Sequence, residues 1–146
     1  CDWSSDVCSS DLGNSPMFPF GFGCSYTDFT YSDMVVEVSD SVKVSCSVRN
    51  KGALNGATVV QVYLGKKESK LERPARRLVA FKRVEISAGK NVQVECEFPI
   101  ERLATREVET HSWYVEDGNW HCEVGQYSGD PHSLTTVLSI PAGIAL

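Results

Sequence analysis

The sequence predicts an all-β fold: a seven-stranded antiparallel β-sandwich with one short helical insertion. Three observations support this prediction. From residue 29 onward, apolar and polar residues alternate with a period of two in short segments rich in β-branched residues. Gly, Asn and Asp residues that favour turns separate these segments. Each segment therefore has one apolar and one polar face, which is the pattern that two packed sheets require.

The expected strands follow one another at regular intervals along the chain. In the second of them, Val42, Val44, Cys46 and Val48 share one face, and polar residues occupy the other. The turn residues Asn50-Lys51-Gly52 and Asn55-Gly56 separate the second segment from the third, and Ala88-Gly89-Lys90 separates the fourth from the fifth. We expect strands at residues 29–38, 42–50, 57–65, 77–86, 92–98 and 134–140, with further strand in a hairpin within residues 112–127.

Two segments carry different signals. Residues 99–109 have the only helix-like periodicity, with Pro99 at the first position and Ile100, Leu103 and Ala104 on one face. This segment is the predicted helical insertion. In residues 112–127, Asp117-Gly118 lies between two alternating runs, a combination typical of a β-hairpin turn.

The chain before the sandwich divides into two parts. Residues 1–12 have no periodicity and are Ser/Asp-rich, so we expect a disordered terminus. Residues 13–28 hold three Phe among Gly and Pro, too apolar for a solvated linker and too irregular for a helix or strand. We expect this segment to be an extended arm over an apolar surface. The sandwich then spans residues 29–142, and residues 143–146 form a tail.

Composition and charge exclude several classes of function. The net charge is −5 and no basic cluster is present, which disfavours nucleic-acid binding. No apolar run approaches the ~18 residues of a membrane span. The cysteines form no CxxC pair, so a zinc site is not expected, and we expect Cys24, Cys46, Cys96 and Cys122 to be free thiols. Free thiols favour a reducing compartment, but the sequence leaves the localisation open.

No catalytic constellation is visible either. Glycoside hydrolysis needs two carboxylates at a fixed separation, and the many acidic residues fall on the polar faces of the expected strands. No G-x-S-x-G elbow is present, and His111, His121 and His132 lack metal-ligand spacing. The sequence thus predicts no catalytic residue, no metal and no cofactor in this chain.

The arm, read on as FPFGFGCSYTDFTYS, resembles a signature of the family-three glycoside hydrolases, the β-glucosidase and β-xylosidase family. In that family the phrase leads into a C-terminal fibronectin type III-like domain. Further motifs resemble the family in the same order: residues 48–52, the strand Gly56-Ala57-Thr58-Val59-Val60-Gln61-Val62-Tyr63, Arg73-Pro74 with Leu78 and Phe81, residues 113–118 and Val124-Gly125. Cys24, Ala80 and Trp120 depart from the residues usual there, without threatening the fold.

The resemblance implies a non-catalytic fragment of a larger enzyme. Its parent would hydrolyse terminal β-linked sugars with retention, using an Asp nucleophile and a Glu acid/base that both lie in other domains. Asp2-Trp3 is similar to part of the nucleophile phrase, but the family's nucleophile lies far upstream of the arm, so Asp2 is not catalytic. Residues 1–12 resemble a translated sequencing adapter, and we exclude them from fold reasoning.

Three groups of residues are candidates for function. Phe18, Phe20, Phe22 and Tyr26 are expected to anchor the domain to the catalytic barrel and α/β sandwich of the parent. In a second group, Pro74 would stiffen a loop, and Arg73, with Arg76 and Arg77, would pair with acids on the adjoining domain.

The third group is aromatic. Tyr114 and Trp120 are possible contacts for an oligosaccharide, and we expect at least one of Trp113 and Trp120 to point into the core. An exposed pair would favour the alternative of an independent carbohydrate-binding module, whereas a buried Trp would weaken it. A cell-surface adhesion domain is a third alternative. Cys46 and Cys122 have inward parity on the two strands that immunoglobulin domains bridge, so a disulfide is geometrically conceivable, although we expect reduced thiols.

Overall fold

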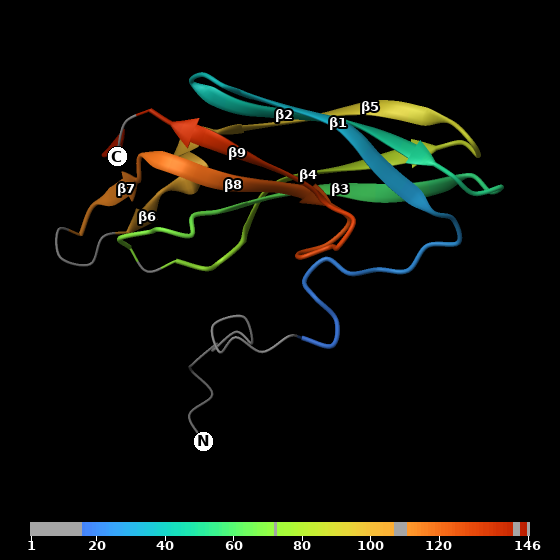
Figure 1. The fold of residues 1–146 in the computed structure, drawn as a ribbon, viewed down its shortest axis with the longest axis horizontal. Coiled ribbons are helices and arrows are strands. Elements are labelled where there is room, and N and C mark those ends of the chain that lie inside the picture. The colour runs from blue at the N-terminus through green and yellow to red at the C-terminus, as the bar shows by residue number, and fades with distance from the viewer. Residues whose placement is uncertain (1–15, 72, 107–110, 142–143, 146) are drawn as a thin grey trace.

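Two antiparallel sheets pack face to face (Figure 1). The computed structural model describes residues 16–71, 73–106, 111–141 and 144–145, so the predicted disordered segment 1–12 lies outside the described residues. The three-stranded sheet has the order β1-β2-β5 and the four-stranded sheet the order β4-β3-β8-β9. Their bounds are β1 Phe29–Val38, β2 Ser41–Asn50, β3 Gly56–Gly65, β4 Arg77–Ile86, β5 Asn91–Pro99, β8 Gly118–Gly125 and β9 Leu134–Ile140. These seven strands confirm the predicted all-β sandwich.

The core lies between the two sheets and follows the alternation of the sequence. In β2, Val42, Val44, Cys46 and Val48 are each at most 2% exposed. Val60, Val62 and Leu64 of β3 face them from the other sheet and are equally buried. Burying each such side chain stabilises the fold by ~1.5–3 kcal/mol, which is why the period-two pattern decides which way every strand faces.

The predicted helix is much shorter than its periodicity suggested. Only one 3-10 turn forms, Ile100–Leu103, and the chain then enters β6, Thr105–Arg106. Ile100, Leu103 and Ala104 are buried, as predicted. The helix ends because Thr105 and Arg106 pair with Tyr114 and Trp113 of β7, Trp113–Val115, instead of continuing the turn. The helical prediction over residues 107–109 lies outside the described residues.

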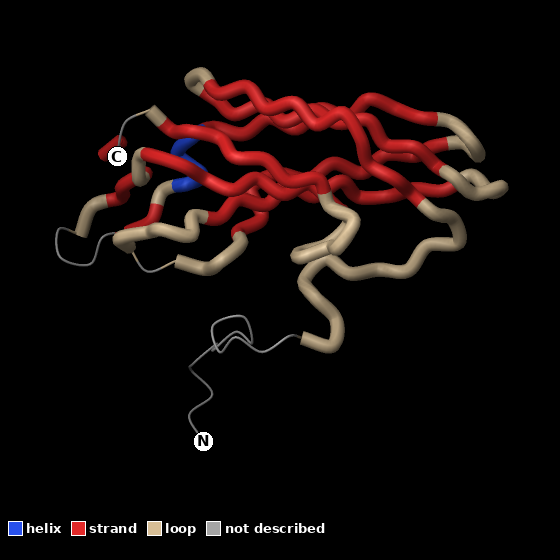
Figure 2. Tube along the Cα trace, viewed as in Figure 1, coloured by secondary structure: helices blue, strands red, loops and turns tan. Residues whose placement is uncertain are grey.

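The predicted hairpin at Asp117-Gly118 is wrong. Strand β7 pairs with β6 and with β10, Ile144–Ala145, whereas β8 pairs with β3 and β9 (Figures 1 and 2). Gly118 does adopt a left-handed φ of 95°. At this residue, however, the chain leaves a small third sheet, of order β10-β7-β6, and enters the four-stranded sheet. Both edges of β7 are paired, with β6 and β10, and both edges of β8 are paired, with β3 and β9. The buried Glu116 between the two strands is held by Ser69 and Lys70 from outside this segment.

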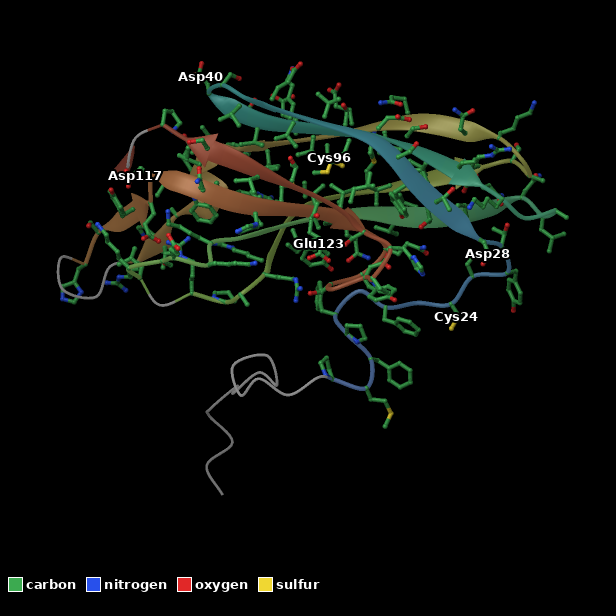
Figure 3. All side chains as sticks on the ribbon, in the orientation of Figure 1. Cys24, Asp28, Asp40, Cys96, Asp117 and Glu123 are labelled. Carbon is green, nitrogen blue, oxygen red and sulfur yellow. The ribbon has the colours of Figure 1, made fainter. Side chains whose placement is uncertain are left out.

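The described cysteines are free thiols, and three of them are buried. Cys46 and Cys96 lie on β2 and β5, and Cys122 lies on β8, so the core-facing parity expected for Cys46 and Cys122 is present without a bond between them. Figure 3 shows Cys96 between the two sheets and Cys24 on the segment before β1. Burial raises the pKa of Cys46 to about 11 and that of Cys122 to about 12, so both thiols stay protonated at neutral pH.

Candidate functional site

The arm forms a tight turn whose backbone requires glycine. We use "the arm" for its described part, residues 16–28. The amide of Phe22 donates to the carbonyl of Pro19 at 3.0 Å, and Gly21 adopts a φ of 81°, the conformation that a type II turn needs at its third residue. A Cβ built on Gly21 would also lie 2.1 Å from Oε1 of Gln61. Two independent constraints therefore select glycine here.

The turn is docked on the outer face of β3 through its main-chain oxygens. The Phe20 carbonyl accepts a hydrogen bond from the amide of Ser128 at 2.9 Å and lies 3.3 Å from the hydroxyl of Tyr63. The Gly21 carbonyl accepts from Nε2 of Gln61 at 3.2 Å. Ser128 belongs to the loop between β8 and β9, and Figure 1 shows the arm running beside this loop. The contacts join three segments that are distant in the sequence.

Gln61 and Tyr63 are polar residues that the arm covers. They are 7% and 2% exposed, although they lie on the face of β3 opposite to the core. Besides Gly21, Gln61 donates to the Gln126 carbonyl, and its Oε1 lies 2.5 Å from the Tyr63 hydroxyl. Burial, and then the charge of Glu123, raise the pKa of Tyr63 to about 12, so its hydroxyl keeps its proton at neutral pH. Both side chains therefore satisfy their polar groups, as a buried network requires.

The aromatic rings of the arm point away from this dock. Phe18 and Phe20 are each 68% exposed, and Met17 and Tyr26 are more exposed still. Phe22 is the exception, because its ring packs edge-on against Tyr127 with the centroids 5.2 Å apart. The expected extended arm over an apolar surface is therefore incorrect in detail. The backbone lies on a polar surface and most rings face outward, because β3 offers amide and hydroxyl groups at this position.

The exposed rings form an apolar cluster with an ordered base. Phe18 lies 5.6 Å from Phe22, which in turn rests on Tyr127. Exposed apolar residues that gather in this way mark interaction surfaces, whereas scattered ones carry no such meaning. Among the predicted interdomain residues, the structure thus brings Phe18 and Phe22 together, Phe20 is exposed on the turn between them, and Tyr26 lies farther along the arm.

Arg73 makes its contacts inside this domain. Its guanidinium lies 2.5 Å from Oε2 of Glu116 and 2.8 Å from Oγ of Ser69, and it covers the ring of Trp120 at 4.6 Å. The side chains of Arg73 and Glu116 are 7% and 5% exposed. The expected pairing of Arg73 with an acid on an adjoining domain is therefore wrong. Its neighbour Pro74 remains exposed.

Arg76 and Arg77 also make contacts inside this domain, but both stay exposed, so their pairing with acids on an adjoining domain stays a prediction. Arg76 pairs with Glu123 of β8 at 2.8 Å, and Arg77 donates to the Ala104 carbonyl at 3.0 Å. The loop also passes close to Gly65, the last residue of β3, where a Cβ would lie 2.0 Å from the carbonyl oxygen of Ala75. The arginines of this loop therefore stabilise the sandwich itself.

Electrostatics at Glu116 favour the ionised carboxylate. Burial on its own raises the pKa of Glu116, but hydrogen bonds from the Ser69 hydroxyl and the Lys70 amide, together with Arg73, outweigh it and hold the pKa below its usual value. Burial lowers the pKa of Arg73, and the nearby carboxylate opposes that shift. The pair is therefore charged on both sides at neutral pH.

The predicted aromatic pair does not present two exposed rings. Trp120 is 3% exposed, donates from Nε1 to the Glu116 carbonyl and has the Lys66 ammonium 5.9 Å from its ring. This agrees with the expectation that one of the two Trp residues points into the core. Tyr114 is half-buried and lines a groove of about 300 Å³, whose other walls are Lys66, Glu68, Lys70, Leu71, Glu116 and Asp117.

Several residues of the site escaped the sequence reasoning. Gln61 and Tyr63 belong to the strand motif of residues 56–63, which by itself gives them no role. A tyrosine on the polar face of a strand does indicate that something covers that face. Tyr127 and Ser128 gave no signal, since Ser128 acts through its backbone amide.

Within the described part of the chain, no group of three or more His, Cys, Asp or Glu side chains could hold a metal ion. No helix of the described residues is long and apolar enough to cross a membrane.

Comparison with known proteins identifies relatives of this chain. Residues 58–128 match the fibronectin type III-like domain. The chain is 35% identical over 123 residues to the thermostable β-glucosidase B of Acetivibrio thermocellus, a match that covers 81% of this chain and 16% of that protein. It is 30% identical over 126 residues to the β-glucosidase BoGH3A of Bacteroides ovatus, covering 83% and 17%.

Comparison with solved structures also finds β-glucosidases. β-Glucosidase 3B of Thermotoga neapolitana in complex with α-D-glucose matches with a TM-score of 0.86 and 29% identity, covering 94% of this chain and 19% of that one. The GH3 β-glucosidase of Bifidobacterium adolescentis matches with a TM-score of 0.84 and 26% identity, covering 92% and 20%. The chain thus spans less than a quarter of the length of these relatives, and it belongs to the fibronectin type III-like domains of the family-three β-glucosidases.

Proposed function

We propose that this chain is a non-catalytic domain that packs on the catalytic domains of a β-glucosidase-like enzyme and stabilises them. The observation that supports the proposal is the exposure of apolar side chains on the arm, with Met17, Phe18 and Phe20 each at least 68% exposed on a docked backbone. A domain that corresponds to 16% of its Acetivibrio relative leaves room for a partner surface in the same polypeptide.

The energetics fit an interface between domains. Fully burying a Phe or Met side chain contributes about 1.5–3 kcal/mol, so three such side chains supply a useful part of the association free energy. Interfaces between domains of one chain are small and partly polar, and the linkage spares most of the entropy cost of association. The exposed apolar side chains of the arm therefore suit a partner that is held nearby in the same chain.

The names of the relatives, together with the family resemblance, support a proposal for the reaction of the parent. The parent would be a retaining β-glucosidase-type hydrolase of terminal β-linked sugars. Two carboxylates in its other domains would act as nucleophile and as acid/base. This chain would contribute no group to the chemistry. Its role would be to keep the catalytic domains folded and, through its position, to border the entrance for substrate.

A binding experiment in trans tests this proposal. The complete 146-residue chain would be mixed with the Acetivibrio thermocellus enzyme from which the aligned region has been removed, and with the Thermotoga neapolitana enzyme truncated in the same way. We expect a complex and a longer half-life of glucosidase activity at elevated temperature. The F18A/F20A variant should lose both effects, and F81A, which truncates an exposed Phe of β4, should keep them. Binding to neither acceptor would contradict the proposal.

The groove beside Tyr114 supports a second candidate function, an independent oligosaccharide-binding module. A half-exposed ring next to the carboxylates of Glu68 and Asp117 and the ammonium of Lys70 offers the stacking face and hydrogen-bonding groups that a sugar needs. The burial of Trp120 weakens this candidate, since it removes the second ring. Titrating the chain with cellobiose while observing its amide NMR signals tests the idea. Shifts that Y114A abolishes would support it, and an unchanged spectrum would rule it out.

A further inference from the structure

We infer that Gln61 and Tyr63 are positioning residues that hold the arm in its partner-ready form, so that Phe18 and Phe20 enter an apolar socket on the catalytic domains as a preformed turn. The inference rests on the proposed function and goes further, because it assigns a role in association to two residues that lie beneath the arm. It also commits to the occupant of that surface: an apolar pocket in the remainder of the same polypeptide.

The arm is fixed from three directions. Its turn is closed internally by the hydrogen bond from Phe22 to Pro19. The Gln61–Tyr63 pair and the Ser128 amide hold the outer side of the turn at two consecutive carbonyls. The ring of Phe22 rests on Tyr127. Phe18 and Phe20 are exposed, but hydrogen bonds and a ring contact hold the backbone that carries them.

A preformed turn lowers the entropy cost of binding. An arm that is free in solution must order its backbone when it meets the partner, and this cost subtracts from affinity. An arm that is already docked has incurred that cost during folding. The Gln61–Tyr63 pair should therefore affect affinity without touching the partner, since the arm covers both side chains.

Gln61 and Tyr63 can be substituted without changing the side chains that form the core. Gln61 and Tyr63 lie on the outer face of β3, and the neighbouring Val60, Val62 and Leu64 fill the inner face. Replacing Gln61 by Leu removes both amide donors and keeps the side-chain size. Replacing Tyr63 by Phe removes only the hydroxyl. Gln93, an exposed residue of β5 in the other sheet, provides a matched control for the loss of a glutamine from a strand.

The first measurement is hydrogen exchange on the complete chain. In Q61L and Y63F, we expect the amides of Phe22 and Ser128 to exchange at least about tenfold faster, because their acceptors belong to the docked turn. Amides of β2 should exchange as in the wild type, which shows that the sandwich remains folded. Q93A should change none of them. Unaltered exchange at Phe22 and Ser128 in both variants would overturn the inference.

The second measurement is the dissociation constant for the truncated enzymes described above. We expect Q61L and Y63F to raise Kd by roughly tenfold or more, since each released arm must be reordered on binding, and Q93A to leave it unchanged. Faster arm exchange with an unchanged Kd would refute the positioning role and leave the proposed function standing. Absence of wild-type binding would refute both, and it would be recognised because F18A/F20A and wild type would then behave alike.

Discussion

Thr27 occupies the space beside Gly52, so that a Cβ built on Gly52 would lie 2.1 Å from Thr27 Oγ1. The same hydroxyl donates to Oδ1 of Asn50, and the Gly52 amide donates to that oxygen at 3.0 Å. The end of the arm and the turn after β2 are thus packed into one unit. The sequence Asn-x-Gly in this turn has a structural cause outside the turn itself.

Replacing Gly52 by Ala should destabilise the domain by about 1–3 kcal/mol, the usual cost of forcing extra volume into a packed site. The measurement is the free energy of unfolding in urea. Gly23→Ala is the control, because a Cβ at Gly23 would meet nothing within 4 Å. Equal stabilities for the two variants would contradict this account.

Replacing Asn50 by Ala should cost about 2–4 kcal/mol, because each buried polar group left unpaired costs about 1–3 kcal/mol. Asn50 is fully buried and donates from Nδ2 to the carbonyls of Leu54 at 2.8 Å and Ile86 at 3.0 Å. Asn119→Ala, at an exposed position of β8, should change stability by less than about 0.5 kcal/mol. Thermal and urea unfolding would measure both.

Replacing Arg73 by Met should destabilise the chain by about 3–5 kcal/mol, since it leaves the Glu116 carboxylate buried without its cation. Arg83→Met removes an ion pair with Glu85 whose side chains are 62% and 74% exposed, and should cost ~0–1 kcal/mol. Adding Glu116→Gln to Arg73→Met should recover part of the loss. Additive effects of the two changes would show that the residues are not coupled.

Stability should fall with acidification because of Glu116. Its pKa is lower in the folded than in the unfolded chain, so ionisation favours folding. The contribution is complete above the unfolded pKa of a glutamate and is lost as the pH falls through the lower folded value. Urea unfolding of wild type and Glu116→Gln from pH 7 downward should show a difference that shrinks in this window. A constant difference would contradict the assignment.

Stability should also fall at alkaline pH because of Tyr63. Its pKa rises from 10.0 to about 12 on folding, so the neutral hydroxyl favours the folded state. The contribution is complete below pH 10 and is lost between pH 10 and about 12. Burial also raises the pKa of Tyr31 to about 12, so its contribution to stability is lost over the same pH range. In an ultraviolet titration, Tyr63→Phe should lack one of the late-ionising tyrosines that the wild type shows.

The strands could be predicted from the sequence because their signals are local. Residues 29–38 and 77–86 were delimited correctly, since alternating apolar residues end at turn-forming ones. The pairing of β7 could not be predicted. Asp117-Gly118 has the composition of a hairpin turn, and the competing contacts of Glu116 come from Ser69 and Lys70, 47 and 46 residues away. Long-range polar contacts of this kind leave no local pattern.

The candidate site was predictable in part for a related reason. The composition of the arm, rich in Phe, predicts an interaction surface, and this stays a prediction. The backbone of the arm is held by Gln61 and Tyr63 on the outer face of β3, and only the large ring of Tyr63 on that polar face signals that something covers it. Arg73 shows the opposite failure, because an arginine in a charged loop suggests a surface contact, and here it is enclosed.

The docking of the arm through the carbonyls of Phe20 and Gly21 has an evolutionary consequence. Because the dock recognises peptide oxygens, it sets no requirement on the side chains at positions 18 and 20. Under the proposed packing, substitutions there could follow changes in the surface of a neighbouring domain while the arm keeps its place. The same sandwich can in this way be inherited by enzymes whose other domains have diverged, with only a few exposed positions adapting to each new neighbour.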